Sequence, residues 1–480
     1  MSRSERRSAA IHSRRRAPIA RSCRPVTKPR ATVGQTDETL FTRFGAPSRA
    51  REAVPVSDAR PNVVCVSIDS LRADHCGFLG DDRGLTPAMD ALAAESTVYE
   101  RAIAPGPQTF SSMPAVVTGH RRPTGPLDAY PGEEHWERRM AAIESHLDRY
   151  PTLAERFAAR GYATAGVSPN PWASTASGFD RGFETFVDLV GERSDDWLHR
   201  AARRAPGIDA SSKPVQLALD GLTGGSFFSS WGDYVDEIDR LRRDLPEPYF
   251  LWVFLMDTHY PFLPSKAHRE EQTLVGSLTS AIRSEAAMRG PSEGLTPAAR
   301  ASVQRSYRDT VRSVDAFVDH LRDGDAQIVL HADHGESFGE HGNYGHHHRA
   351  CYTENVHVPL VVAGPAERVA EPISLDRIPA MALSVADDSA DPRAHTAPAV
   401  TATSECGTNA CVRGRRFAYV EREEGRSLFE WAHDPNERDD LAPTHPDLCD
   451  RARRRLDYRE GSRRETAALA SAAQAIAPEW

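Results

Sequence analysis

The sequence has no apolar run of about 18 residues, the length at which a helix begins to be long enough to cross a bilayer. No apolar core follows the arginines near the N-terminus either. The sequence therefore predicts neither a membrane span nor a secretory signal, and these absences favour a cytoplasmic protein.

Cysteine is also scarce, with seven residues scattered over 480 positions. An odd number, with Cys65 in the middle of a predicted strand, argues against a disulfide framework. Cys406 and Cys411 flank a short Gly-Thr-Asn turn, so they either pair with each other or remain thiols.

Positive charge is unevenly distributed along the chain. Residues 1–52 contain 13 Lys or Arg and 4 Asp or Glu, which is a net charge of +9. The whole chain has a net charge of −9, so the remaining residues carry −18. Such an arm could contact nucleic acid or anionic lipid. It lacks aromatic residues spaced for base stacking and a periodic apolar face, which favours a disordered tail over residues 1–55. No clear nucleic-acid partner is predicted.

The order of periodic segments predicts an α/β fold. Buried strands are expected at 61–69, 162–167 and 249–255, and another from 327. Helices are expected between them, and that alternation indicates a doubly wound sheet with helices on both faces. The expected helices are 86–95, 111–118, 152–160 and 297–321.

Composition divides the rest of the chain. Residues 56–365 form the predicted catalytic domain, with a polar, Gly/Ser-punctuated insertion at about 185–245. Residues 366–480 are expected to hold a Pro/Ala/Asp-rich linker up to about 400, then a small C-terminal α+β subdomain. Within it, short antiparallel strands are predicted at 411–430 and a charged helix at about 445–458.

Two of the apolar strand segments end in acidic and histidine residues. Asp69 follows the first, and Asp333 with His334 follows the strand from 327. The carboxyl ends of parallel strands face the crevice where α/β sheets bind ligands, so these ends can converge on one metal ion. The alternative is that each is an ordinary strand-to-loop junction capped by polar residues.

Further segments stand in the same order as in the sulfatase family of the alkaline phosphatase superfamily, which this chain resembles. Each motif alone is weak, but their common order is specific. The resemblance implies an alkaline-phosphatase-like α/β/α sandwich. Its segments are Asp69 to His75 (DSLRADH), Thr86 to Ala93 (TPAMDALA), Thr109 to Gly119 (TFSSMPAVVTG), Asp257 to Pro261 (DTHYP), Asp333 to Glu336 (DHGE) and Tyr352 to Pro365 (YTENVHVPLVVAGP).

The resemblance assigns roles to particular residues. Asp69, Asp333 and His334 match the family's metal ligands, and Thr109 matches the nucleophile, which also contacts the metal. Compared with the usual ligands of sulfatases, this chain has fewer carboxylates and an added imidazole. This difference favours Mn²⁺ or Zn²⁺, with Ca²⁺ or Mg²⁺ as alternatives.

Histidines supply the remaining predicted catalytic and substrate-binding groups. His259 matches a substrate-contacting or leaving-group histidine of the family. One of His346, His347 and His348 is expected to bind the ester oxygens or a second metal, and spacing to Tyr352 favours His347.

The nucleophile segment departs from the family pattern. Sulfatases carry Cys or Ser in Cys/Ser-x-Pro-x-Arg, which is oxidised to formylglycine, whereas this chain has Thr109-Phe110-Ser111-Ser112-Met113. Threonine cannot become formylglycine. A threonine on a metal resembles the phosphate-ester branches of the superfamily, such as nucleotide phosphodiesterases.

These observations predict a metal-dependent hydrolase of sulfate or phosphate esters. Its substrate would be a small-molecule, glycan or lipid-headgroup ester. Two alternatives stay open: a phosphoglycerol or phosphoryl transferase of the same superfamily, and a catalytically degenerate binding protein.

Overall fold

The structure is a computed structural model, in which the described residues form one compact unit. The predicted basic arm and most of the predicted insertion fall outside the residues it describes. Those residues are 60–123, 133–190, 230–289, 295–346 and 350–476.

An eight-stranded mixed sheet forms the core, with the strand order β12-β2-β11-β7-β1-β6-β4-β5. β7, β1, β6, β4 and β5 are parallel, and β11 runs antiparallel to both β7 and β2. The central strands are buried along nearly their whole length, which explains their continuous apolar sequences. In chain order the strands are β1 (Val63–Ile68), β2 (Thr97–Tyr99), β4 (Ala163–Ser168), β5 (Thr185–Asp188), β6 (Tyr249–Leu255), β7 (Gln327–Ala332), β11 (Leu360–Val362) and β12 (Glu367–Val369).

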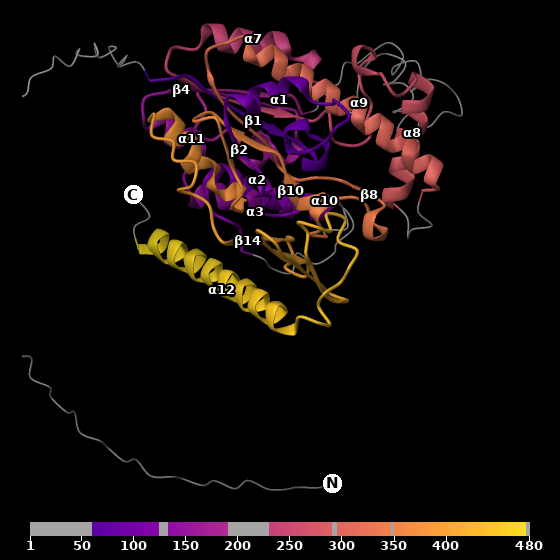
Figure 1. Ribbon diagram of the computed structural model, residues 1–480. Helices are drawn as coiled ribbons and strands as arrows, with labels where there is room; N and C mark the ends of the chain where they lie inside the picture. Colours follow the sequence, from indigo (N-terminus) through magenta and orange to yellow (C-terminus); the bar gives the residue numbers. More distant parts are fainter. Residues whose placement is uncertain (1–59, 124–132, 191–229, 290–294, 347–349, 477–480) are drawn as a thin grey trace, which may run out of the picture. The chain divides into compact units, whose positions relative to one another are not determined.

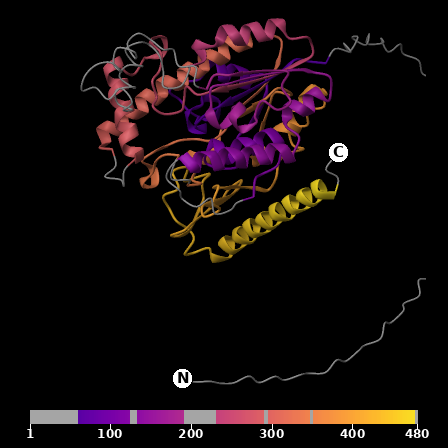
Figure 2. The same ribbon diagram turned by 180° about the vertical axis from the view of Figure 1, so that it is seen from behind.

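Helices cover both faces of this sheet, as Figures 1 and 2 show from opposite sides. The predicted doubly wound α/β fold is therefore confirmed. On one face lie α2 (Thr109–Thr118), α3 (Glu133–Arg149), α4 (Leu153–Ala158) and α11 (Ile378–Ala386). On the other lie α1 (Pro87–Ala94), α7 (Val235–Asp244) and α9 (Pro297–Arg322), and α8 (Leu274–Arg289) packs against α9.

Shorter elements surround the carboxyl end of the sheet. A three-stranded sheet has the order β10-β3-β13, and β8 pairs with β9. These elements are β3 (Ala102–Ile103), β8 (Ser337–Phe338), β9 (Tyr344–Gly345), α10 (Thr353–Val356), β10 (His357–Val358) and β13 (Ile373–Ser374).

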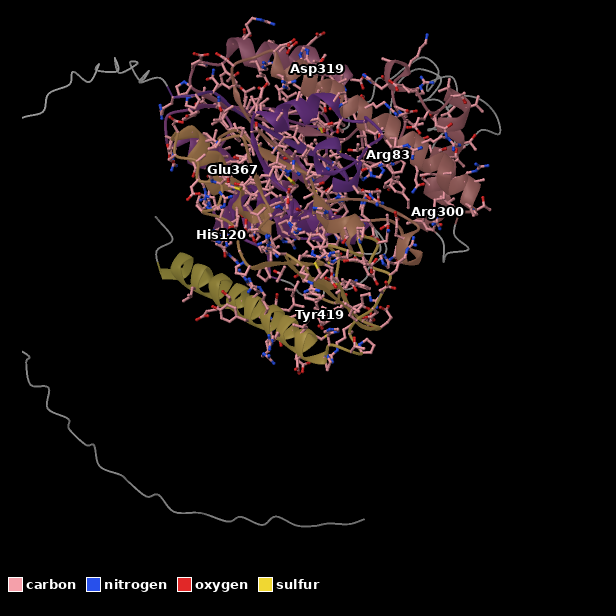
Figure 3. The ribbon with its side chains drawn as sticks, viewed as in Figure 1. Arg83, His120, Arg300, Asp319, Glu367 and Tyr419 are labelled. Atoms are coloured by element: carbon pink, nitrogen blue, oxygen red, sulfur yellow. The ribbon has the colours of Figure 1, made fainter. Side chains whose placement is uncertain are left out.

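A four-stranded antiparallel sheet and the long helix α12 follow at the C-terminal end (Figure 1). Tyr419 marks this sheet in Figure 3, and Glu367 marks the edge of the main sheet. The predicted strands are present, and α12 continues well beyond the predicted end near 458. The elements are β14 (Ala399–Thr403), β15 (Ala410–Gly414), β16 (Ala418–Arg422), β17 (Gly425–Phe429) and α12 (Pro446–Ile476).

The stretch 366–400 differs from the expected linker. β12 joins the main sheet beside β2, and α11 packs on β1 and α2. Ile378, Met381 and Val385 are buried in the main core, because their helical spacing places them on one face of α11.

Two expected absences can be checked against the described residues. No helix among them is both long enough and apolar enough to span a bilayer. The six cysteines they include are all free, so Cys406 and Cys411 are thiols here.

Candidate active site

Two adjacent parallel strands bring the predicted metal ligands together. β1 and β7 pair with Ile68 opposite Ala332, so Asp69 and Asp333 leave the sheet side by side at its carboxyl edge. His334 follows directly. The ligand atoms of these three residues all lie within 4.8 Å of one another, and all three side chains are fully buried.

The hydrogen bonds of His334 and Asp333 leave ligand atoms facing the centre of this cluster. His334 Nδ1 donates to the Gly335 carbonyl at 2.8 Å, which leaves Nε2 as the acceptor, 3.6 Å from Asp69 Oδ1 and 3.7 Å from Asp333 Oδ2. Asp333 Oδ2 is buried without a hydrogen-bond partner among the described residues. Burial, together with the negative charge of Asp69, raises the pKa of Asp333 to about 7.

These observations test whether the residues fit a divalent cation. Two carboxylates and an imidazole converge in a buried space, and one carboxylate oxygen accepts no hydrogen bond from the described residues. A cation would satisfy that oxygen and compensate the two negative charges. The donor set therefore fits a divalent metal.

Thr109 is the first residue of α2 and points at the same cluster. Its Oγ1 lies 3.3 Å from His334 Nε2 and 3.4 Å from Asp69 Oδ2. The helix starts here because extended Gln108 forms a capping box with Ser111. The first N–H groups of a helix lack intrahelical partners, so this end favours a negatively charged group.

Ser70 fixes the two carboxylates. Its Oγ donates to Asp69 Oδ1 at 2.7 Å, and its N–H donates to Asp333 Oδ1 at 3.3 Å. The residue has a φ of 60°, a left-handed conformation that is uncommon for serine. The strained turn therefore places both groups of Ser70 on the metal-ligand candidates.

Asn170 belongs to the site but was not predicted. Its Nδ2 donates to Asp69 Oδ2 at 2.8 Å, while its Oδ1 accepts from the Trp172 N–H at 2.8 Å, which fixes the orientation of the amide. The available signal was the Asn-Pro turn after β4, a strand whose carboxyl end faces the same edge.

The histidines form a second group at the edge of the cluster. The His346 ring lies 4.6 Å from the His334 ring and 5.2 Å from the His259 ring, between centroids. Buried Glu336 contacts His346 Nδ1 through Oε2 at 3.2 Å. His347 and His348 lie outside the described residues, so the choice of His347 stays a prediction.

Arg72 connects the loops after β1 and β7, which lie around these histidines. Its buried guanidinium pairs with Asp74 at 2.6 Å and Glu340 at 2.8 Å, and it donates to the Glu336 carbonyl at 3.0 Å. The loop after β1 is thereby fixed to the loop after β7.

Comparisons with known proteins show the family of this chain. A family model described as Sulfatase matches residues 61–387. The chain is similar to an arylsulfatase of Clostridium perfringens, with 26% identity over 233 residues, 43% of this chain and 45% of that protein. It is also similar to human (Homo sapiens) iduronate 2-sulfatase, with 22% identity over 355 residues, 65% of this chain and 61% of that protein. The chain thus spans less than two thirds of either relative.

The fold is also found among solved structures. The phosphonate monoester hydrolase of Agrobacterium radiobacter superposes with a TM-score of 0.58 at 18% identity, covering 85% of this chain and 96% of that one. At this identity the likeness shows the fold alone. The match of the family model over most of the chain goes further, and the chain belongs to the sulfatase family.

Proposed function

We propose that this protein is a metal-dependent hydrolase of sulfate or phosphate esters, with Thr109 as its nucleophile. The observation that carries the proposal is the position of Thr109 Oγ1, 3.3 to 3.4 Å from His334 and Asp69 in a buried cluster that fits a cation. The two similar proteins found by sequence are sulfatases, which favours hydrolysis over the transferase and binding alternatives.

Asp69, Asp333, His334 and Thr109 would hold the metal, for which we favour Mn²⁺ or Zn²⁺ from the mixed oxygen and nitrogen donors. A divalent cation there supplies positive charge that lowers the pKa of a hydroxyl and offsets the charge of an ester's oxygens. Thr109 Oγ1 would form a bond to the sulfur or phosphorus atom while the bond to the leaving oxygen breaks, and its hydroxyl proton passes to water. A water molecule would then hydrolyse the ester on Thr109, which releases sulfate or phosphate and restores the hydroxyl. Ser70 and Asn170 keep Asp69 oriented during the reaction.

His259 is the proposed donor to the leaving oxygen, and one of His346, His347 and His348 is proposed to bind the ester oxygens or a second metal. The Nδ1 of His259 donates to the Tyr260 carbonyl at 2.6 Å, which fixes the ring near His346. An alkoxide or phenoxide leaves more readily when a positioned acid protonates it. The substrate class that we propose is a small-molecule, glycan or lipid-headgroup ester.

The proposal is tested by assaying purified protein with an aryl sulfate, an aryl phosphate monoester and an aryl phosphate diester. The protein is first stripped of metal and then given Mn²⁺, Zn²⁺, Mg²⁺ or Ca²⁺ in turn. We expect metal-dependent turnover of at least one ester, and a fall in kcat of at least about 10²-fold in Thr109→Ala, because a nucleophile has been removed.

Thr109→Ser is the matched control, since it keeps the hydroxyl and should retain turnover with the same preferred metal. Full activity of Thr109→Ala, or equal activity after metal removal, would overturn the proposed mechanism. Sulfate release by the wild type that survives Thr109→Ala would assign the nucleophile to another group.

A further inference from the structure

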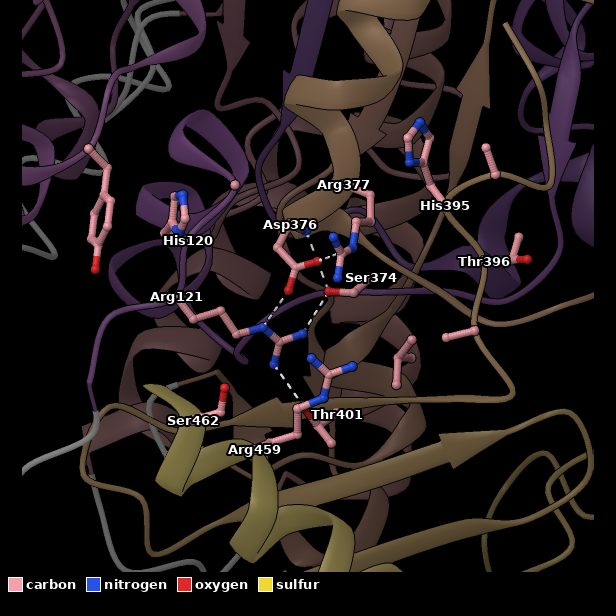
Figure 4. A pocket seen from close by; sticks show the side chains of 15 residues that line it. His120, Arg121, Ser374, Asp376, Arg377, His395, Thr396, Thr401, Arg459 and Ser462 are labelled. Carbon is pink, nitrogen blue, oxygen red and sulfur yellow. Dashed lines mark hydrogen bonds and ion pairs between the residues drawn. The ribbon is translucent and has the colours of Figure 1, made fainter. Parts of the chain in front are cut away.

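A cavity of about 350 Å³ lies between the C-terminal end of α2, the start of α11, β14 and α12. Figure 4 shows its polar lining, in which the guanidinium groups of Arg121, Arg377 and Arg459 face a common space. His120 and His395 also line it (Figure 4), and His120 lies between the main sheet and α12 in Figure 3.

Asp376 is the one carboxylate among the described residues that line the cavity, and it pairs with two of the three arginines. Asp376 pairs with Arg121 at 2.7 Å and with Arg377 at 3.3 Å. Arg121 also donates to Ser374 Oγ at 2.6 Å and to Thr401 Oγ1 at 3.1 Å, so its guanidinium is well satisfied. Three guanidinium groups against one carboxylate leave two positive charges at the cavity.

Arg459 carries the least compensated of these charges. It makes no hydrogen bond or ion pair among the described residues. Its half-buried position, together with the positive charges of Arg121 and Arg455, lowers the pKa of Arg459. Arg455 stands one helical turn earlier on α12, and like charges four residues apart destabilise a helix. The fold thus maintains an unfavourable concentration of charge that a bound anion would relieve.

This cavity is separate from the proposed catalytic centre. Thr109 begins α2 and Gly119 follows its end, so the two sites lie at opposite ends of a helix about 15 Å long. The described lining of the cavity contains none of Asp69, Asp333 and His334.

We propose that this cavity is a second binding site, for a tetrahedral oxyanion: a sulfate or phosphate group, either free or part of an ester. Arginine binds such groups through paired N–H donors. A tetrahedral anion presents oxygens in several directions, and the three arginines approach from η8 (Leu375–Arg377), from α12 and from the segment after α2. A planar carboxylate offers only two oxygens to the same set.

The test is calorimetric titration of the full chain after chelation and dialysis. Without a metal, the carboxylates of Asp69 and Asp333 repel anions from the proposed catalytic centre. The binding that the titration measures is therefore at the arginine-lined cavity. Sodium sulfate, sodium phosphate and a phenyl sulfate ester are titrated separately, with chloride balancing ionic strength. We expect binding of a tetrahedral anion with one site per chain, weakened about tenfold or more in Arg459→Gln.

Arg454→Gln is the matched control, because it removes the same charge from an exposed position of α12. It should bind like the wild type. Arg377→Gln gives an independent variant and should also weaken binding, with circular dichroism showing that each variant is folded. Binding of all three ligands shows that a free anion suffices, whereas binding of the ester alone assigns the site to an esterified group. No binding by the wild type, or equal weakening by Arg459→Gln and Arg454→Gln, would overturn the proposal.

Discussion

At the scale of single residues, the proposed reaction separates the nucleophile from the leaving-group donor. Thr109 Oγ1 lies 3.3 Å from the metal-ligand candidate His334, whereas the His259 ring lies beside the His346 ring, 5.2 Å away between centroids. Glu336 contacts the Nδ1 atom of His346. Burial, together with the negative charge of Asp69, raises the pKa of Glu336 well above its ordinary value. The buried carboxyl group thus orients the His346 imidazole beside the metal-ligand candidates.

Replacement of His259 by Asn should therefore depend on the leaving group. Asn keeps a donor near the Tyr260 carbonyl but cannot act as an acid. We expect kcat to fall on the order of 10²-fold for a phenyl ester and much less for a p-nitrophenyl ester, whose leaving group needs no proton. Steady-state kinetics with the two esters measures the difference. Equal losses for both would mean that His259 only positions the substrate.

Sequence patterns found the residues that directly follow buried strands. Asp69, Asp333 and His334 were predictable because their strands read as continuous apolar runs, and the structure brings all three together with Thr109. Asn170 was missed because its contact with Asp69 depends on the order of the strands in the sheet, which no single segment encodes. A run of three histidines likewise contains no pattern that selects one of them.

At the scale of elements, α1 is capped by a residue of another helix. Its N-cap Thr86 makes no side-chain cap bond, and Asp315 of α9 instead accepts from the N–H groups of Ala88 at 3.1 Å and Met89 at 2.8 Å. Burial raises the pKa of Asp315 to about 6, and the two N–H bonds oppose this shift.

This pKa predicts a pH-dependent difference in stability between the wild type and Asp315→Asn. A carboxyl whose folded pKa exceeds its unfolded value of 3.8 contributes stability below pH 3.8, and that contribution is lost as pH rises through 6. The unfolding free energy of the wild type relative to the variant should fall by about 1–3 kcal/mol between pH 4 and 6.5. Urea unfolding at several pH values measures it. A constant difference would show that the helix N-terminus offsets burial.

Helices and strands were largely predictable where one pattern of apolar residues continued over the whole element. Examples are the helical spacing in α9 and the continuous apolar runs of the central strands. The error at 366–400 arose because prolines and aspartates around α11 dominated its composition. The helical spacing of Ile378, Met381 and Val385 was visible in the sequence but short. The sequence could not show that β12 belongs to the main sheet, because its partner β2 (Thr97–Tyr99) lies 270 residues earlier in the chain.

At the scale of the whole molecule, a buried ion pair connects the C-terminal sheet to the segment that follows the histidines. Arg413 of β15 is fully buried and pairs with Glu437. It also donates to Thr353 Oγ1 at 2.7 Å and to the Cys351 carbonyl at 2.9 Å, while Glu437 accepts from the Thr353 N–H at 3.0 Å. Both partners thus hold the same short segment in place.

Loss of one partner should destabilise the protein far more than loss of both. Glu437→Gln leaves the Arg413 charge buried without its counter-charge, so we expect a loss of about 3–5 kcal/mol in the free energy of unfolding. The double variant Arg413→Met with Glu437→Leu buries no charge and should recover much of that loss. Urea unfolding of Arg413→Met, Glu437→Leu and the double variant gives the coupling energy, with Glu437→Gln measured beside them. Breaking an exposed ion pair, such as Arg393 with Glu367, is the control. If Glu437→Gln lowered the free energy of unfolding no more than that control, the buried pair would not anchor the subdomain. The C-terminal sheet would then be held by its apolar core alone.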